Sequence, residues 1–386
     1  MINHRLRQLR LARGFSLEAL AAAMGGIVTK QALSKYEKGT IQPSHEVLNK
    51  LAATLQVKAA YLWSEPAVSV EILAYRKGSH LPKKEQAQIE SLTRHRLEQR
   101  IRLQRLLASQ DTAVLPICKR AIKTPEAAEQ AAAETRQSWN LGEDPIASVT
   151  GVLEDHHIHV LEIDAGEKFD GISAVAYDQD QQILAAAVVT RKGLPGERQR
   201  LSLVHELAHI VGCESETVAF RFGAAFLAPA RAVLREVGTN RSFIQSEELL
   251  LLKRRWGMSI QAILYRLRDL GIIAETYYKQ WCIHISQLGW RKQEPFPFPA
   301  EQPTWLYQNV LRALSEGVLS KEEAEEMVGE EIKADLPLSL IQRHAFMRLP
   351  LEERRRLLAE QADKLEASYT EDPEAQVLGG GDFVEY

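Results

Sequence analysis

The chain has 386 residues, of which 45% are hydrophobic and 26% are charged, and its formal net charge at pH 7 is −3. This length accommodates two or three domains with cores of their own, and the composition excludes a membrane-spanning chain, because no run of eighteen apolar residues and no signal-peptide pattern occurs. Three widely spaced cysteines, Cys118, Cys213 and Cys282, argue against a disulfide framework, so we expect a cytoplasmic protein with no membrane partner.

Residues 1–65 have the pattern of five short helices. Ser16 and Thr29 are N-cap residues before LEALAAAM and KQALSKYEKG, and a glycine pair turns the chain between these segments. A fourth helix starts after Pro43, and a fifth ends at YLW. Residues 1–125 hold 21 Lys and Arg against nine Asp and Glu, a formal charge of +12, which predicts a polyanionic partner.

This segment resembles the Cro/repressor type of helix-turn-helix, in which LSKYEKG matches the end of the recognition helix. The resemblance implies binding to double-stranded operator DNA, and repressors of this type usually pair as homodimers on palindromes. The residues expected to face base edges are Lys30, Gln31, Ser34 and Lys35. Those expected to contact phosphates are Thr29, Lys38 and Arg10. The family commonly has Gln where Leu17 stands, and a helical module for protein contacts is the alternative.

Residues 66–124 are predicted to be a basic helical linker. The segment SLTRHRLEQRIRLQRLL is rich in arginine and has the length of a single helix. Its charges either extend the nucleic-acid surface or form the solvated face of a connecting helix, and the charge run favours the second interpretation.

Residues 125–280 are predicted to form the second domain. Pro125 begins an alanine-rich helix, and the alternation in HIHVLEI, ISAVAYD and QILAAAVV predicts strands. The strands lead to RQRLSLVHELAHI, which contains the HExxH pattern. Residues four apart lie on one face of a helix, so His205 and His209 can offer two imidazoles to one zinc ion, while Glu206 reaches a water molecule at the site.

A zinc site of this kind needs a third protein ligand. Glu216 opens the segment SETVAFRFGAAFLAP, in which Ser215 is an N-cap residue, so Glu216 lies in the first turn of a second helix. Cys213 and Glu214 are alternatives, ranked lower because a thiolate beside two histidines is typical of closed structural sites and Glu214 lies in the preceding turn. An ordinary amphipathic helix with two surface histidines is the alternative to any metal site.

The run PGERQRLSLVHELAHIV, followed by E-x-x-A-x-x-F-G-x-x-F-L-x-P, resembles the ImmA/IrrE family of zinc metallopeptidases. The resemblance implies His205, His209 and Glu216 as zinc ligands and Glu206 as the general base. It also implies a zincin-like domain that cleaves another regulatory protein, such as a repressor or antitoxin. This sequence has Phe220 where the family usually has Asn or Asp.

Residues 281–386 are predicted to be a helical C-terminal extension. The segments LYQNVLRALSEG and SKEEAEEMVG form a helical pair, and LPLEERRRLLAEQADKLEASY is an amphipathic helix that leads into an acidic tail. Residues 316–386 hold 18 Asp and Glu against eight Lys and Arg, a formal charge of −10. This extension is interpreted as an arm for dimerisation or for a partner.

The predicted fold class is α+β and mostly helical. A five-helix DNA-binding domain is followed by a zincin-like metallopeptidase domain with a small sheet and by a helical C-terminal region. The predicted function is transcriptional regulation with zinc-dependent endopeptidase activity. The alternative is a non-proteolytic repressor or antitoxin whose metallopeptidase fold binds a partner.

Overall fold

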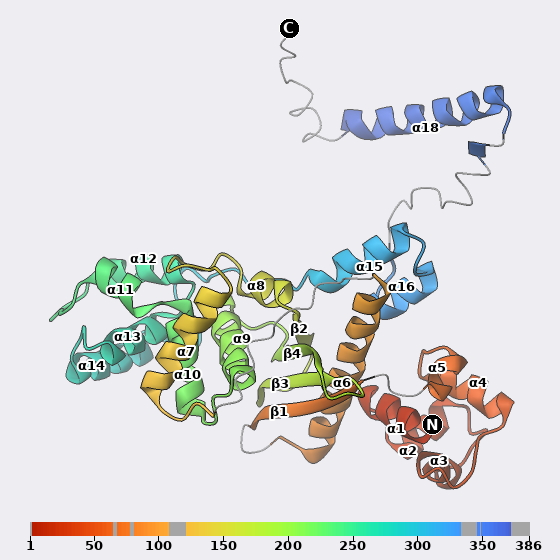
Figure 1. Cartoon of the computed structure of the whole chain (residues 1–386), viewed down its shortest axis with the longest axis horizontal. Coiled ribbons are helices and arrows are strands. Elements are labelled where there is room, and N and C mark those ends of the chain that lie inside the picture. The colour runs from red at the N-terminus through yellow and green to blue at the C-terminus, as the bar shows by residue number, and fades with distance from the viewer. Residues whose placement is uncertain are drawn as a thin grey trace.

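A computed structural model of the chain describes residues 2–64, 68–77, 81–107, 121–332, 346–347 and 349–371. Figure 1 shows a small helical unit near the N-terminus, a larger body built around a sheet, and helix α18 (Leu351–Glu371) apart from both. The predicted acidic tail after Glu371, like Cys118, lies outside the described residues.

Residues 2–64 form five helices around one hydrophobic core, as predicted. The helices are α1 (Ile2–Ala12), α2 (Leu17–Ala23), α3 (Lys30–Glu37), α4 (His45–Thr54) and α5 (Ala59–Trp63). Ser16 and Thr29 cap α2 and α3 through hydrogen bonds from backbone N–H groups at the third position of each helix. Gly25 and Gly26 both have positive φ, +77° and +74°, a conformation that glycine adopts without steric cost.

The second unit contains a four-stranded mixed sheet. Its strands are β1 (Ser69–Lys77), β2 (Ile158–Ile163), β3 (Phe169–Tyr177) and β4 (Ile183–Arg191), in the order β1-β3-β4-β2. Strands β2 and β4 are parallel, whereas β3 is antiparallel to both of its neighbours. The strands predicted in HIHVLEI, ISAVAYD and QILAAAVV are confirmed. Strand β1 comes from the segment predicted as a linker.

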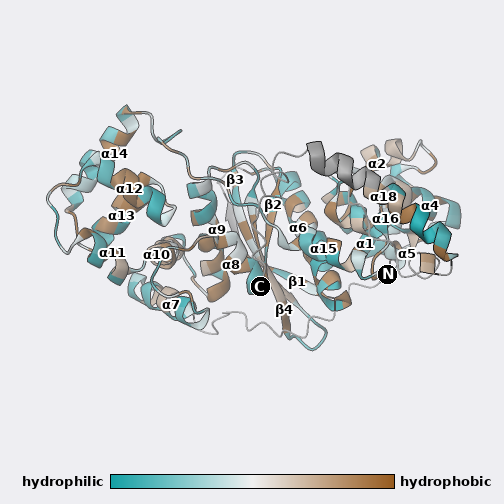
Figure 2. Cartoon of the chain, turned by 90° about the horizontal axis from the view of Figure 1, so that it is seen from above, coloured by the Kyte–Doolittle hydropathy of each residue, from teal (hydrophilic) through white to brown (hydrophobic). Residues whose placement is uncertain are grey.

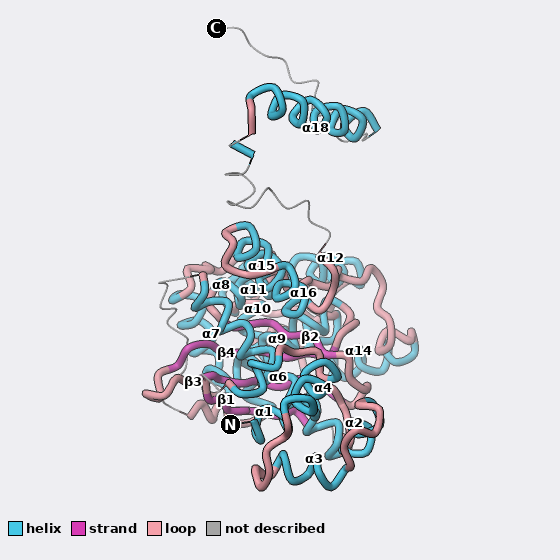
Figure 3. The backbone as a smooth tube through the Cα atoms, turned by 90° about the vertical axis from the view of Figure 1, so that its right-hand side faces the viewer, coloured by secondary structure: helices cyan, strands magenta, loops and turns pink. Residues whose placement is uncertain are grey.

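The sheet is buried on both faces. Alternate residues of its strands, such as Val160 and Val188, enter a core shared with helix α9 (Gly196–Val211). Their neighbours Leu161 and Val189 enter a second core against helix α6 (Lys83–Leu106). Figures 2 and 3 show the strands as one layer with helices on either side. One side of α6 is therefore a packing face, which its charge pattern did not predict.

The helices of the predicted metallopeptidase domain pack into the core that includes α9. Besides α9 they are α7 (Pro125–Ser138), α8 (Val149–Asp155), α10 (Glu216–Leu227), α11 (Ala230–Val237), α12 (Ser246–Trp256), α13 (Ile260–Asp269) and α14 (Glu275–Gln287). Helix α10 packs against both α7 and α9, so the HExxH segment and the segment that follows it lie side by side.

Residues 294–304 then bring the chain back to the core that includes α9. Glu301 accepts hydrogen bonds from the backbone N–H groups of Val149 and Thr150, at 3.1 and 2.6 Å, and pairs with Arg200 of α9. Helices α15 (Trp305–Ser315) and α16 (Lys321–Val328) follow and share a core with the end of α6. This arrangement confirms the predicted α+β, mostly helical fold class with a helical C-terminal region.

Within the described ranges, no single helix has both the length and the apolar composition needed to cross a membrane. Helices α10 and α11 pass that test only when taken together across a bend of 60°.

Candidate metal centre and nucleic-acid interface

Two consecutive helices bring the predicted metal ligands together. Helix α9 carries His205 and His209 on one face and ends at Gly212, whose φ of 114° reverses the chain. Ser215 then caps α10 by accepting a hydrogen bond from Val218 N, which fixes Glu216 in the first turn. Glu216 thereby faces the two histidines.

The distances between these side chains fit a tetrahedral metal. The Nε2 atoms of His205 and His209 are 3.3 Å apart. The Glu216 carboxylate lies 3.2 Å from His205 Nε2 and 3.8 Å from His209 Nε2. Tetrahedral zinc bonds of about 2.0–2.1 Å place ligand atoms about 3.3 Å apart. The three residues therefore have the spacing of a metal site, with their ligand atoms within 4.8 Å of one another.

Hydrogen bonding orients one histidine of the site, and the site is open to solvent on one side. His209 Nδ1 lies 2.9 Å from the carbonyl oxygen of Cys213, and donation to that oxygen leaves the Nε2 lone pair free to bind a metal. The His205 side chain is fully buried, whereas the Glu216 side chain is 55% exposed. The site is therefore open on the Glu216 side.

Glu206 lies against strand β3. A Cβ atom added to Gly171 would lie 2.5 Å from Glu206 Oε1 and 2.9 Å from its Cδ, so the missing side chain at this position makes room for the carboxylate. The sequence analysis did not single out Gly171. A glycine inside a predicted strand is nevertheless a signal of close approach by another group.

The alternative third ligands are placed differently. Glu214 forms an exposed ion pair with Lys123 at 3.6 Å. Cys213 contacts His209 through its backbone carbonyl oxygen, which lies 2.9 Å from His209 Nδ1. Among the described residues, His205, His209 and Glu216 form the group of His, Cys, Asp or Glu side chains whose ligand atoms lie close enough together to bind one metal ion. The geometry thus favours Glu216.

The predicted DNA-contacting residues lie mostly on an exposed surface of α3. Thr29, Lys30, Gln31, Lys35 and Lys38 are exposed, and Ser34 is half-buried. Helix α3 lies on the side of the first unit that faces away from α16 (Figure 1). This surface is accessible, and its one described ion pair joins Lys30 to Glu18, both largely exposed. Such pairs are weak in water, so a phosphate can replace Glu18.

Arg10 is placed differently from the other predicted contacts. It is 8% exposed, its guanidinium pairs with Glu37, and it donates a hydrogen bond of 2.8 Å to the carbonyl oxygen of Phe15. These contacts join α1 to α3, and the Glu37 carboxylate neutralises the Arg10 charge inside the domain. We therefore leave Arg10 out of the proposed DNA interface.

Comparisons with known families agree with both units. A chain with this fold and these sites combines a DNA-binding domain with a metallopeptidase-type domain. Residues 6–62 match the helix-turn-helix family, and residues 153–268 match the IrrE N-terminal-like domain of peptidase family M78. The chain is thus a fusion of these two domains, which confirms the resemblance seen in its sequence motifs. No curated protein and no solved structure matches the chain.

The match of residues 153–268 to this peptidase family implies a metal, and the His205, His209 and Glu216 cluster is the place in the described chain that fits one. The helix-turn-helix domain implies binding to double-stranded DNA and a role in transcription regulation. These are the functions that follow from the families alone.

Proposed function

We propose that the protein is a transcription regulator whose second domain is a zinc-dependent endopeptidase, and that its substrate is another regulatory protein such as a repressor or antitoxin. The observation that carries this proposal is the convergence of two imidazole nitrogens and one carboxylate within 4.8 Å, on a helix that also carries Glu206. Of the boundaries predicted from the sequence, we keep 1–65 for the DNA-binding domain and 281–386 for the C-terminal extension. We assign strand β1 and helix α6, which lie in the predicted linker 66–124, to the same unit as residues 125–280, because both pack in its sheet and core.

In this proposal His205, His209 and Glu216 hold the ion. When bound, zinc supplies Lewis acidity, which lowers the pKa of water and polarises a carbonyl group. Glu206, set against Gly171, takes a proton from the attacking water and delivers it to the nitrogen of the leaving amine. The peptide C–N bond breaks, and the products are a carboxylic acid and an amine.

The peptidase proposal is tested with two variants of the full chain. We expect about one zinc ion per chain in the wild type and in Glu206→Gln, and a loss of zinc in His209→Ala, measured by atomic emission. Cleavage is read by comparing protein N-termini in cells that express the wild type or Glu206→Gln. New N-termini that need Glu206 would identify the substrate, with a drop in rate of about a hundredfold or more in the variant.

A Glu206→Gln variant that binds zinc and regulates transcription as well as the wild type would contradict the peptidase proposal. The protein would then be a non-proteolytic repressor or antitoxin whose metallopeptidase fold binds a partner.

For DNA, we propose that Lys30, Gln31, Ser34 and Lys35 read bases, and that Thr29 and Lys38 contact phosphates. We expect Gln31→Ala to weaken specific binding to the protein's own promoter by about 1–3 kcal/mol with an unchanged salt dependence. We expect Lys38→Ala to lower affinity for all sequences and to reduce the salt dependence by about one ion. Fluorescence anisotropy at several salt concentrations measures both. Unchanged binding in both variants would mean that residues outside α3 recognise the DNA.

The predicted homodimer has a separate test. Light scattering of the protein–DNA complex gives its mass and hence the number of chains bound.

A further inference from the structure

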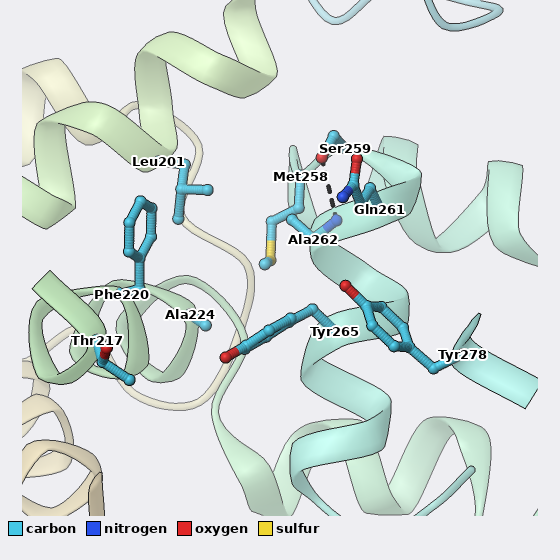
Figure 4. A pocket seen from close by; sticks show the side chains of 10 residues that line it. All are labelled: Leu201, Thr217, Phe220, Ala224, Met258, Ser259, Gln261, Ala262, Tyr265 and Tyr278. Carbon is cyan, nitrogen blue, oxygen red and sulfur yellow. Dashed lines mark hydrogen bonds between the residues drawn. The ribbon is translucent and has the colours of Figure 1, made fainter. Parts of the chain in front are cut away.

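A cavity of 380 Å³ lies among helices α9, α10, α13 and α14 (Figure 4). In Figure 4, Leu201 and Phe220 line one side of this space, and Met258, Tyr265 and Tyr278 line the other. The lining residues come from segments up to 77 positions apart in the chain, Leu201 and Tyr278 being the first and last. No motif in the sequence marks them.

The cavity adjoins the candidate metal centre through Phe220. Leu201 lies one helical turn before His205 on α9, and Phe220 lies one turn after Glu216 on α10. The Phe220 ring also packs on the imidazole of His205, with 4.3 Å between ring centroids. If a peptide bond is held at the metal centre, the side chain next to that bond can therefore reach this cavity.

The cavity is lined by uncharged residues, and more of its surface is apolar than polar. None of its ten lining residues is Asp, Glu, Lys or Arg. Burial, followed by the nearby Cys282 thiol, raises the pKa of Tyr278 to about 12, so its hydroxyl stays neutral at physiological pH. A charged side chain would lose its hydration here without gaining a partner of opposite charge.

The cation that stacks on the two lining tyrosines is already matched by acidic groups. Arg268 stacks on the rings of Tyr265 and Tyr278, with its Cζ atom 4.0 and 4.8 Å from their centroids. It pairs with Asp269 at 2.7 Å and with Glu275 at 3.5 Å. Arg268 thus contacts both tyrosine rings through cation–π stacking, which favours their observed positions.

The size of the cavity is set by small residues on opposite walls. Ala224 lies one turn beyond Phe220 on α10, and Ala262 is on α13. A volume of 380 Å³ is at the lower end of the range of about 300–1,000 Å³ that binds small ligands, and it has room for a large side chain.

We propose that this cavity binds a substrate side chain next to the scissile bond and selects a bulky, uncharged, apolar side chain such as that of Phe or Leu. This inference rests on the proposed peptidase function and adds the substrate class to it. The burial of apolar surface on both partners supplies the selectivity.

The test uses phosphinic peptides, in which a phosphinate replaces the scissile bond and residues continue on both sides. The flanking positions carry Phe, Trp, Ala or Asp, one position varied at a time. Their dissociation constants for the zinc-loaded full chain are measured by calorimetry, which needs no catalytic turnover. We expect Phe to bind at least about tenfold more tightly than Ala at one of the two positions, and Asp more weakly than Ala.

Two variants and a control place this selectivity in the cavity. Ala262→Phe fills the space, so the Phe and Ala peptides should bind this variant about equally tightly. Tyr278→Ala enlarges the space, so the preference should shift towards Trp. The control is Ala274→Phe, an exposed position at the start of α14 that does not line the cavity, and it should keep the wild-type preference.

The outcomes separate this inference from the proposed function. A zinc-loaded protein that binds the Phe, Ala and Asp peptides equally would overturn the inference and leave the peptidase proposal standing. The same holds for a Phe preference that both cavity variants retain. A protein that takes up no zinc would overturn the proposed function and this inference with it.

Discussion

At the scale of single residues, the contact between Glu206 and Gly171 decides how the proposed general base is held. The Glu206 side chain is 1% exposed and occupies the space that a β-carbon at position 171 would fill. A carboxylate in a defined position is needed to transfer a proton between water and a leaving amine.

We expect Gly171→Ala to displace the Glu206 carboxylate and to lower the rate of peptide cleavage by about tenfold or more, while zinc content stays at the wild-type level. Zinc analysis and the cleavage rate of an identified substrate are the two measurements. Gly166→Ala is the control, because a β-carbon there would meet only the flexible end of Glu85, at 3.2 Å. Equal rates in Gly171→Ala and Gly166→Ala would mean that Glu206 is not held by this contact.

At the scale of elements, a buried charge cluster ties the start of α9 to α12 and to residues 294–304. Lys253 of α12 is fully buried and pairs with Glu197 of α9 and, at 2.9 Å, with Glu294. Glu197 also accepts a hydrogen bond of 3.0 Å from Phe298 N. The cluster joins three segments that are far apart in the sequence and supports the helix that carries both histidines.

We expect Lys253→Met to lower the free energy of unfolding by about 3–5 kcal/mol, because it leaves two carboxylates buried without their cation. Urea unfolding followed by circular dichroism measures this change. The matched control is Lys279→Met, whose 70% exposed side chain pairs with Glu275 at 3.6 Å along one helix, and it should change stability by less than about 0.5 kcal/mol. A similar loss of unfolding free energy in both variants would show that the buried cluster stabilises the fold no more than an exposed ion pair does.

At the scale of the whole molecule, the helix-turn-helix domain packs on the unit that contains the sheet. Arg5 of α1 pairs with Glu98 of α6, and the Tyr61 hydroxyl of α5 lies 3.3 Å from His95 Nδ1 of α6. On a neighbouring side, Lys58 pairs with Glu323 of α16 at 3.0 Å. The DNA-binding domain therefore contacts both the helix under the sheet and the C-terminal helices.

We expect this interface to make the protein less stable in acid. Burial, with the guanidinium groups of Arg13, Arg5 and Arg96, lowers the pKa of His95 to about 4 from its ordinary value of 6.5. The folded state thus keeps His95 neutral, so its contribution to stability is complete above pH 6.5 and is lost as the pH falls towards 4.

Between pH 7.5 and pH 5 we expect His95 to account for a loss of about 2 kcal/mol in the free energy of unfolding. His95→Gln should remove that part of the pH dependence, whereas His45→Gln, at an exposed position on α4, should retain it. Urea unfolding at the two pH values gives the numbers, and hydrogen exchange in α1 and α5 reports on the interface itself. A pH dependence that is identical in the wild type and His95→Gln would exclude this histidine as its source.

Much of this molecule followed from local sequence signals. The caps at Ser16, Thr29 and Ser215 and the alternation of the three central strands predicted the elements, because capping and periodicity act over a few residues. The HELAH segment and Glu216 predicted the candidate metal cluster, because helical spacing alone places His205 and His209 on one face.

Only the tertiary structure decided the rest, because it depends on contacts between segments far apart in the chain. It placed strand β1 and helix α6 on the sheet, although their sequence was interpreted as a linker. It buried Arg10 against Glu37, set Gly171 against Glu206, and joined four helices around an apolar cavity. Each of these depends on how whole elements pack, and neither periodicity nor residue spacing carries that information.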